Sequence, residues 1–285
     1  MNLIKLIDMK KYSFKFVNAC FAICMILCGC GASNSDSAKI KMTTEVSYIS
    51  FIVGGIGTVT VDWGDGSKKE EMTIGKSFII YEHYYKKASK HTITISGDEI
   101  AALQCSDLIS LDVSKCSELK NLKCDGNKLT SLDVSNCTAL TNLDCSNNQL
   151  TSLDASNCSA ILALNCSNNK LTSLGVNNCS VMRNLNCSNN QLTSLNVSGC
   201  IALTDLDCRE NKLTGFDVSN CIALTDVDCS HNQFAATSLD ALFGTLHKNA
   251  IVMKRKYLNI SSNIGEKDCN RSIAHGNGWY VSNSR

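Results

Sequence analysis

Cysteine is the residue type in this sequence that could do the most chemistry, because 18 of the 285 residues are cysteines. Thiolates can bind zinc, form disulfides or act as nucleophiles. From Cys116 to Cys229 the intervals between cysteines alternate between 8 and 13 residues. This spacing contains no C-x-x-C pair for zinc, and no single thiol differs from its equivalents as a nucleophile would. The thirteen cysteines in the middle of the chain are Cys105, Cys116, Cys124, Cys137, Cys145, Cys158, Cys166, Cys179, Cys187, Cys200, Cys208, Cys221 and Cys229.

Disulfides between these cysteines are also disfavoured. The Cβ atoms of a disulfide lie about 3.5–4.5 Å apart, whereas adjacent strands of a sheet are about 4.8 Å apart. Linking cysteines on stacked strands would therefore distort the strand register. We expect free thiols that fill narrow interior positions as small apolar side chains, with no metal among them and no cofactor.

Other catalytic patterns are missing from the sequence. It has no nucleophile elbow, no H-E-x-x-H pair and no phosphate-binding loop, and its five histidines are scattered. Only His231 falls near the exposed face of the predicted repeat sheet, beside Asp228. We predict no catalytic residue, so an enzyme is the least favoured class of function.

The cysteines belong to a 21-residue repeat that extends over residues 101–234. Two aliphatic columns, an asparagine column and a further apolar column recur six times without a change in spacing. The four columns are Leu119, Leu140, Ile161, Met182, Leu203 and Leu224; Leu122, Leu143, Leu164, Leu185, Leu206 and Val227; Asn127, Asn148, Asn169, Asn190, Asn211 and Asn232; and Leu129, Leu150, Leu171, Leu192, Leu213 and Phe234.

The pattern L-x-x-L-x-C-x-x-N-x-L resembles the short leucine-rich repeats of internalin-like bacterial surface proteins. The resemblance covers residues 101–234. It implies a leucine-rich-repeat solenoid, a right-handed β/α superhelix of 21-residue repeats with a parallel β-sheet on its concave face. It also implies a non-catalytic protein that binds a protein ligand through this sheet.

Stacking explains the columns. One repeat cannot bury its own apolar side, so neighbouring coils share a continuous core. In the second copy we expect a strand at residues 142–146, with Leu143 and Cys145 pointing inward and the other three side chains outward. The column asparagine should satisfy backbone groups of the next coil that would otherwise be buried without partners.

The outward residues of the strands are the candidate binding surface. They are neutral and amide-rich in the middle copies and acidic in the last two, where like charges inside the roughly 8 Å Debye length repel each other. We expect this acidic end, with Glu210 beyond it, to bind a basic patch on a partner or a divalent cation; a solvated face without a ligand is the alternative. The candidate ligand-binding residues are Asp144, Asn165, Asn186, Asp205, Asp207, Asp226 and Asp228.

Residues 1–30 are typical of a bacterial lipoprotein signal peptide. A basic segment precedes an apolar run of about 12 residues, shorter than the roughly 20 that a membrane-spanning helix needs. The segment L-C-G-C at 27–30 resembles a lipobox, which makes Cys30 the expected lipidation site. An ordinary cleaved signal is the alternative, and translation can begin at Met1 or Met9. Residues 31–42 are expected to be a linker.

Residues 43–100 are expected to form a β-rich N-terminal cap. Strands are predicted at 48–53, 58–67, 77–85 and 91–96, separated by turns rich in Gly and Ser. The D-W-G-D-G segment that begins at Asp62 resembles PKD-type immunoglobulin-like domains, although the segment is shorter than a full sandwich. We therefore expect its strands to complete their core on the first repeat. Asp62 and Asp65 could form a metal loop, but an Asp-Gly turn needs no ion.

Residues 235–285 are expected to form an α/β C-terminal cap, since an uncapped coil would expose its core and a strand edge. The pattern predicts a helix at 238–246 with Ser238 as N-cap and a short helix at 268–274. It predicts strands at 256–260 and 278–281.

The net charge and the expected lipid anchor limit the classes of partner that this protein can bind. A net charge of +1, from 27 basic and 26 acidic residues, provides no field that favours nucleic acid. We expect a monomer anchored to the bacterial outer membrane through Cys30 and exposed at the cell surface, with a periplasmic orientation as the alternative. Its leading function is to bind a protein ligand in adhesion or cell interaction. The second is an accessory glycan-binding lipoprotein, although aromatic platforms are not predicted on the sheet, because Trp63 and Trp279 lie in the caps.

Overall fold

A computed structural model describes residues 39–75, 77–249 and 255–282. The predicted signal peptide, Cys30 and most of the predicted linker lie outside the described residues. None of the helices in the described part of the chain is long and apolar enough to span a membrane.

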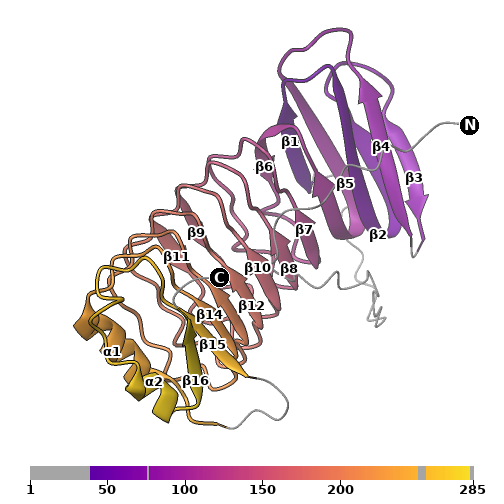
Figure 1. Cartoon of the computed structure of the whole chain (residues 1–285). Coiled ribbons are helices and arrows are strands. Elements are labelled where there is room, and N and C mark those ends of the chain that lie inside the picture. Colours follow the sequence, from indigo (N-terminus) through magenta and orange to yellow (C-terminus); the bar gives the residue numbers. More distant parts are fainter. Residues whose placement is uncertain (1–38, 76, 250–254, 283–285) are drawn as a thin grey trace, which may run out of the picture. The chain divides into compact units, whose positions relative to one another are not determined.

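The repeat forms a ladder of short parallel strands, one in each coil (Figure 1). Each strand pairs in register with the strand 21 residues later, as the constant spacing of the leucines predicts. This arrangement is a leucine-rich-repeat solenoid. The strands of this main sheet are β7 (Asn121–Lys123), β8 (Asn142–Asp144), β10 (Ala163–Asn165), β12 (Asn184–Asn186), β13 (Asp205–Asp207) and β14 (Asp226–Asp228).

The return side of the coils consists of turns and two short parallel strands, β9 (Ser152–Asp154) and β11 (Ser173–Gly175). Within the described residues, helices occur only after the last repeat. The repeats therefore lack the helix that the expected β/α superhelix contains. The return segments are rich in Thr, Val, Ser, Asn and Asp, which are weak helix formers.

The aliphatic and cysteine columns form one continuous core. The middle residue of each main-sheet strand is at most 4% exposed, and the cysteine that follows the strand is fully buried. The outward direction predicted for residue 146 is wrong, because Ser146 is only 4% exposed. Its hydroxyl lies in the turn that ends the strand, where it donates to the Asp144 carboxylate at 2.7 Å.

The asparagine column links consecutive coils. The Asn148 side-chain amide donates to the carbonyls of Cys124 and Cys145 at 2.8 and 3.1 Å, and its Oδ1 atom accepts from the Leu129 N–H at 3.0 Å. The predicted structural role of the asparagine is confirmed. Leu129 and Cys124 lie in the preceding coil, however, whereas the prediction placed the bonded backbone groups in the next coil. Consecutive asparagines share these acceptors, since Asn127 also donates to the Cys124 carbonyl at 2.9 Å. The column therefore satisfies buried backbone groups along the stack.

The N-terminal cap is built on two long antiparallel strands, β2 (Tyr48–Asp62) and β5 (His91–Cys105). Their pairing is interrupted beside Gly55, where a Cβ atom would collide with the Glu99 carbonyl oxygen. The two strands predicted at 48–53 and 58–67 are thus a single irregular strand, which ends at Asp62 and not at residue 67 as predicted. The remaining strands of the cap are β1 (Ile40–Thr44), β3 (Glu70–Ile74), β4 (Phe78–Tyr84) and β6 (Leu108–Asp112).

The cap and the solenoid share a strand. The first part of β5 pairs with β1, whereas Ala102–Gln104 of β5 pairs in parallel with β7 and so begins the main sheet. The buried side chains of the cap and of the repeats belong to one continuous core. The predicted linker extends too far, because Ile40 and Met42 of β1 are fully buried.

Aromatic side chains fill the core of the cap. The ring of Phe51 lies 5.5 Å from the rings of both Trp63 and Tyr81, measured between centroids. Asp62 and Asp65 each accept a hydrogen bond from the N–H two residues later, at 3.0 and 2.9 Å. They stabilise turns, as predicted. The resemblance to PKD-type domains stays a prediction.

The C-terminal cap extends the ladder by two further parallel strands, β15 (Lys256–Asn259) and β16 (Trp279–Ser282). Helix α1 (Ala236–Thr245) precedes β15, and the short helix α2 (Ser272–Gly276) precedes β16. Ser238 is not the N-cap, because α1 begins two residues earlier and its N-cap Ala235 makes no side-chain capping bond. The start of α2 also lies later than predicted.

Candidate functional site

The main sheet presents two columns of side chains on the face opposite the core. The first and third residues of each three-residue strand contribute to this face, because side chains alternate along a strand. The registers continue through β15 and β16. The first column is Asn121, Asn142, Ala163, Asn184, Asp205, Asp226, Tyr257 and Tyr280, and the second is Lys123, Asp144, Asn165, Asn186, Asp207, Asp228, Asn259 and Ser282.

The second column contains five of the seven predicted binding residues, and each of them also holds a turn. The Oδ1 atom of Asp144 accepts from the N–H of Ser146 at 3.1 Å, and the equivalent atom of Asn165 accepts from Ser167 at 3.2 Å. Asn186, Asp207 and Asp228 form the same bond. One oxygen of each side chain is therefore occupied by its own backbone, and only the remaining atoms are available to a ligand.

Asp207 departs from the predicted site. Its side chain is fully buried, so the expectation that it faces outward is wrong. In four other coils a serine hydroxyl donates to this position, but Arg209 replaces the serine here. Its Nε atom lies 3.5 Å from Asp207 Oδ2, and its Nη1 atom lies 3.9 Å from Asp228 Oδ2. Burial raises the pKa of Asp207 to about 7 even though the Arg209 charge opposes this shift.

The acidic end therefore consists mainly of Asp205 and Asp226, which are paired neighbours in the first column and are both partly exposed. Asp205 Oδ2 accepts from the Thr204 hydroxyl at 2.6 Å. Glu210 is exposed beyond the strand. Among the described residues no group of three or more His, Cys, Asp or Glu side chains is arranged to hold a metal ion.

Exposed tyrosines occupy both ends of the sheet. Tyr257 and Tyr280 follow Asp226 in the first column; they are 36% and 58% exposed, and their ring centroids lie 5.8 Å apart. At the other end, Tyr48 on β2 and Tyr84 on β4 have ring centroids 4.6 Å apart. All four tyrosines belong to strands of the caps, so the aromatic rings that the repeat strands do not carry are supplied on either side of the repeats.

The sequence contains a signal for the C-terminal pair. The segment Y-L-N-I-S-S-N at 257–263 aligns with D-V-D-C-S-H-N at 226–232, but the offset is 31 residues instead of 21. Asn263 takes the place of the column asparagine and accepts from the Phe234 N–H at 3.1 Å. A search that allowed one long insertion would have placed Tyr257 on the face.

The cysteine columns form no reactive site. All thirteen repeat cysteines are free and buried, as predicted. On the return side each thiol from Cys137 onward donates to a carbonyl of the preceding coil, for example Cys158 to Val134 at 3.5 Å and Cys200 to Val176 at 3.4 Å. Burial raises the pKa of these two thiols to about 11 and 12, which suppresses the thiolate form.

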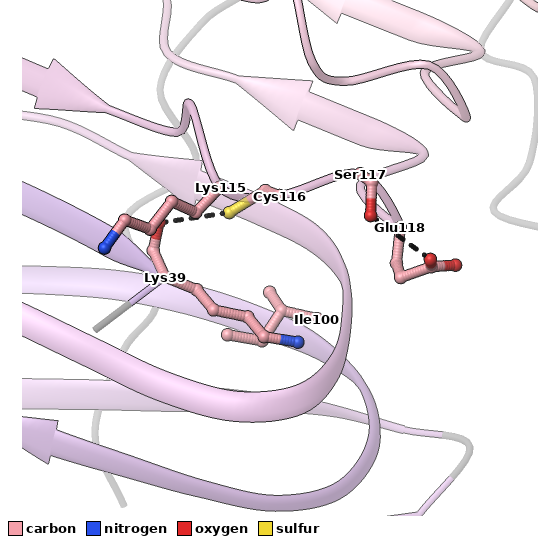
Figure 2. Close-up of a pocket in the computed structure, with 6 residues that line it drawn as sticks. All are labelled: Lys39, Ile100, Lys115, Cys116, Ser117 and Glu118. Carbon is pink, nitrogen blue, oxygen red and sulfur yellow. Dashed lines mark hydrogen bonds between the residues drawn. The ribbon is translucent and has the colours of Figure 1, made fainter. Parts of the chain in front are cut away.

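A small pocket lies where the cap meets the first return segment (Figure 2). Its volume of about 10 Å³ corresponds to the space for one water molecule. The Cys116 thiol, which lines it, donates to the Lys39 carbonyl at 3.4 Å. The pocket is too small for an organic ligand. The other lining residues are Ile100, Lys115, Ser117 and Glu118.

Several solved leucine-rich-repeat structures are similar to this chain. The functional domain of InlJ from Listeria monocytogenes, described as including a cysteine ladder, is 30% identical with a TM-score of 0.45, over 65% of this chain and 44% of that one. The leucine-rich-repeat domain of APL1B is 25% identical with a TM-score of 0.47, over 60% and 50%. YopM from Yersinia enterocolitica WA-314 is 22% identical with a TM-score of 0.42, over 57% and 34%.

The chain thus spans half or less of the length of these solved chains. No protein-family model matches the chain, and no curated protein matches it.

Proposed function

We propose that this chain is a non-catalytic binding protein of the bacterial cell envelope that presents the exposed face of its main sheet to a protein partner. The observation that carries the proposal is the face itself. Its two side-chain columns stay in register from β7 to β16, and amides and carboxylates fill most of their positions, with Asp207 the buried exception. In a solenoid, side chains that successive coils hold in register form a rigid surface suited to binding a macromolecule.

The amide centre of the face supports a protein ligand. Asn142 Nδ2 donates to Asn121 Oδ1 at 2.9 Å, so neighbouring coils fix the orientation of the amides. Ordered side chains lose less conformational entropy when a partner binds. The polar groups of the centre would supply directional hydrogen bonds, while the tyrosines at the ends supply apolar contact area.

Substitutions on the face test this function. We would introduce Asn142→Arg and Asn184→Arg, which place a bulky charge in the centre of the first column without entering the core. A partner isolated with the unmodified chain should bind these variants at least about tenfold more weakly, because a misplaced charge at an interface costs over 1.4 kcal/mol.

The return side provides matched controls. Thr138 and Ser180 are exposed there, and the substitutions Thr138→Arg and Ser180→Arg should leave partner binding unchanged. Equal losses with both pairs, or no loss with the face variants, would show that binding does not use this face.

A glycan ligand is the second candidate, and the tyrosines favour it. Exposed aromatic rings can stack on the apolar faces of sugars, and the sheet carries the Tyr48–Tyr84 and Tyr257–Tyr280 pairs. A glycan array probed with the unmodified chain, and with Tyr84→Ala and Tyr280→Ala, separates the two candidates. Glycan binding that both substitutions abolish would favour this second function.

The proposed location rests on the sequence. Lipidation at Cys30 would anchor a monomer in the outer membrane, and display at the cell surface would bring the sheet to partners outside the cell. Metabolic labelling with a fatty-acid analogue should label the unmodified chain but not Cys30→Ser. Protease treatment of intact cells should remove a surface-displayed chain, whereas a periplasmic chain would survive it.

A further inference from the structure

The candidate face continues beyond the repeats into the N-terminal cap. Gln104 of β5 lies opposite Lys123 of β7, so the face extends over β5. From β5 the registers lead to β2 and then to β4, where Gln104, Ile52 and Ile80 are successive neighbours. Strand β4 pairs with β2 and with no other described strand. The face therefore ends at the outer edge of β4.

This edge presents backbone hydrogen-bonding groups. The Tyr85 N–H donates to the Ser47 carbonyl at 2.8 Å, and this pair continues the register of β4 on β2. In an antiparallel pair, hydrogen-bonded residues alternate with residues whose N–H and C=O groups point away from the partner strand. By this alternation Ile80, Glu82 and Tyr84 direct their backbone groups away from β2, toward the edge.

The side chains of the same residues are exposed and mostly apolar. Ile80 and Tyr84 are 62% and 77% exposed, and Glu82 between them accepts from the Tyr48 hydroxyl at 2.7 Å. Among the described residues no basic side chain forms an ion pair with Glu82. Edge strands that must stay unpaired are commonly protected by lysine, proline or several charges. Strand β4 contains no lysine or proline, and Glu82 is its only acidic residue.

We propose that an extended segment of the protein partner pairs with β4 as an added strand of the sheet. This inference rests on the proposed function, since it names how one part of the partner binds. An extended segment matches a strand edge because its main chain supplies the complementary hydrogen-bonding groups and its alternate side chains supply specificity.

The side chains of β4 define the segment. Residues directly opposite each other on paired strands interact, so the segment should place apolar residues opposite Ile80 and Tyr84 and a basic residue opposite Glu82. Residues 31–38 of the chain itself do not fit this pattern, because they contain no basic and no large apolar residue. The occupant is therefore expected to come from another protein.

Peptide binding tests the added strand. The probe is a fluorescently labelled peptide, Thr-Val-Thr-Lys-Thr-Val-Thr, which presents the required apolar and basic residues on one face, and a matched peptide contains Glu in place of Lys. Anisotropy measures binding to the full chain. We expect the lysine peptide to bind about tenfold more tightly than the glutamate peptide. The variant Glu82→Lys should reverse this preference, whereas Glu71→Lys on the neighbouring strand β3 should not.

Methylated peptides show whether main-chain bonds hold the probe. In antiparallel addition the N–H groups of the valines and the lysine face β4, and those of the threonines between them face solvent. Methylation of the first set of nitrogens should therefore weaken binding about tenfold, whereas methylation of the second set should not. The reverse result would support addition in the parallel direction. Equal effects of the two methylations would overturn the inference.

A proline on β4 tests the same bonds from the side of the protein. Ile80→Pro removes an N–H that points to the edge, and proline is tolerated on an edge strand at such a position. The variant should keep its melting temperature and bind the lysine peptide about fivefold more weakly. Ile80→Val, which keeps the N–H, should bind as the unmodified chain does. If Ile80→Pro does not fold, the methylated peptides and Glu82→Lys still decide the question.

Three further results separate this inference from others. Loss of a protein partner with Asn142→Arg but not with Ile80→Pro would overturn the added strand and leave the proposed function standing. Peptide binding at β4, together with a partner that is insensitive to Asn142→Arg, would support the added strand and count against the proposed function. Self-association of the chain that Ile80→Pro abolishes would identify a second copy as the occupant and overturn the inference.

Discussion

The Nε atom of Arg209 lies 3.5 Å from the Oδ2 atom of Asp207, a buried carboxylate oxygen that accepts no hydrogen bond. At the equivalent position of the neighbouring coils a serine hydroxyl donates to the side chain. The Arg209 guanidinium thus compensates the charge of the Asp207 carboxylate, which has no serine hydroxyl in its own coil. Strand alternation alone would place Asp207 in solvent, but its side chain is buried.

Asp207→Asn should stabilise the protein in a pH-dependent manner. The pKa of Asp207 in the fold is raised from 3.8 to about 7, so the folded state retains a proton that the unfolded state has lost between these pH values. Stability from this group therefore falls as pH rises from about 4 to 7. The variant should match the unmodified chain at pH 4 and exceed its stability at pH 8 by about 1 to 3 kcal/mol. Thermal melts over this pH range measure the difference.

Asp144→Asn is the matched control for this effect. Asp144 occupies the same column, but it accepts from both the N–H and the hydroxyl of Ser146. The amide should therefore bring no comparable gain at pH 8. A gain at Asp207 that is the same at every pH would contradict an origin in titration.

Asn148→Ala should destabilise the solenoid by about 1 to 3 kcal/mol, because it leaves the Leu129 N–H buried without a partner. It also removes one of the two amide donors to the Cys124 and Cys145 carbonyls. Asn148→Asp should cost at least as much, since a carboxylate cannot donate to the carbonyls of Cys124 and Cys145. Chemical denaturation measures both. Asn178 is exposed on the return side, so Asn178→Ala should change stability by less than about 0.5 kcal/mol.

Brief treatment of the folded protein with N-ethylmaleimide should leave the thirteen repeat cysteines unmodified. Their thiols are buried, and the thiolate form that reacts is suppressed because burial raises the pKa, for example to about 12 for Cys179. Cys269 is only partly buried and serves as the internal control. Peptide mapping should find it modified first. Rapid modification of a repeat cysteine under native conditions would contradict a permanently closed core.

Glu210→Asn should stabilise the protein by about 0.5 to 1 kcal/mol. Glu210 has a φ of +53°, a conformation that the equivalent positions of earlier coils fill with Gly126, Asn147, Asn168 and Asn189. Asparagine adopts it at a lower cost than other side chains with a Cβ atom. Glu210→Ala, which keeps the Cβ atom but lacks the amide, should give no such gain. Equal gains from both substitutions would point to the loss of the glutamate charge instead.

The core of the repeat could be predicted because each position recurs six times with constant spacing. A column such as Leu143 or Cys145 has one environment in every coil, so the period alone assigns it to the interior. The same reasoning succeeded for free thiols, since stacked cysteines share one backbone geometry.

The sequence could not predict features that depart from the period. Strand alternation placed Ser146 outward, but the Asp144 side chain turns the chain at that point and buries the serine. The ten additional residues before β15 hid the tyrosines of the last two strands. Whether Asp207 is exposed depends on Arg209, a single substitution in one coil, and alternation contains no information about such a contact.

Because β5 is an antiparallel strand of the cap at one end and a parallel strand of the solenoid at the other, no peptide bond marks the border between the two. Cutting the chain there would remove the strand onto which β7 docks, and the exposed edge would be free to recruit another molecule. A minimal fragment that stays monomeric would therefore have to start before Ile40, and a foreign domain fused in front of the repeats would have to supply a strand of its own.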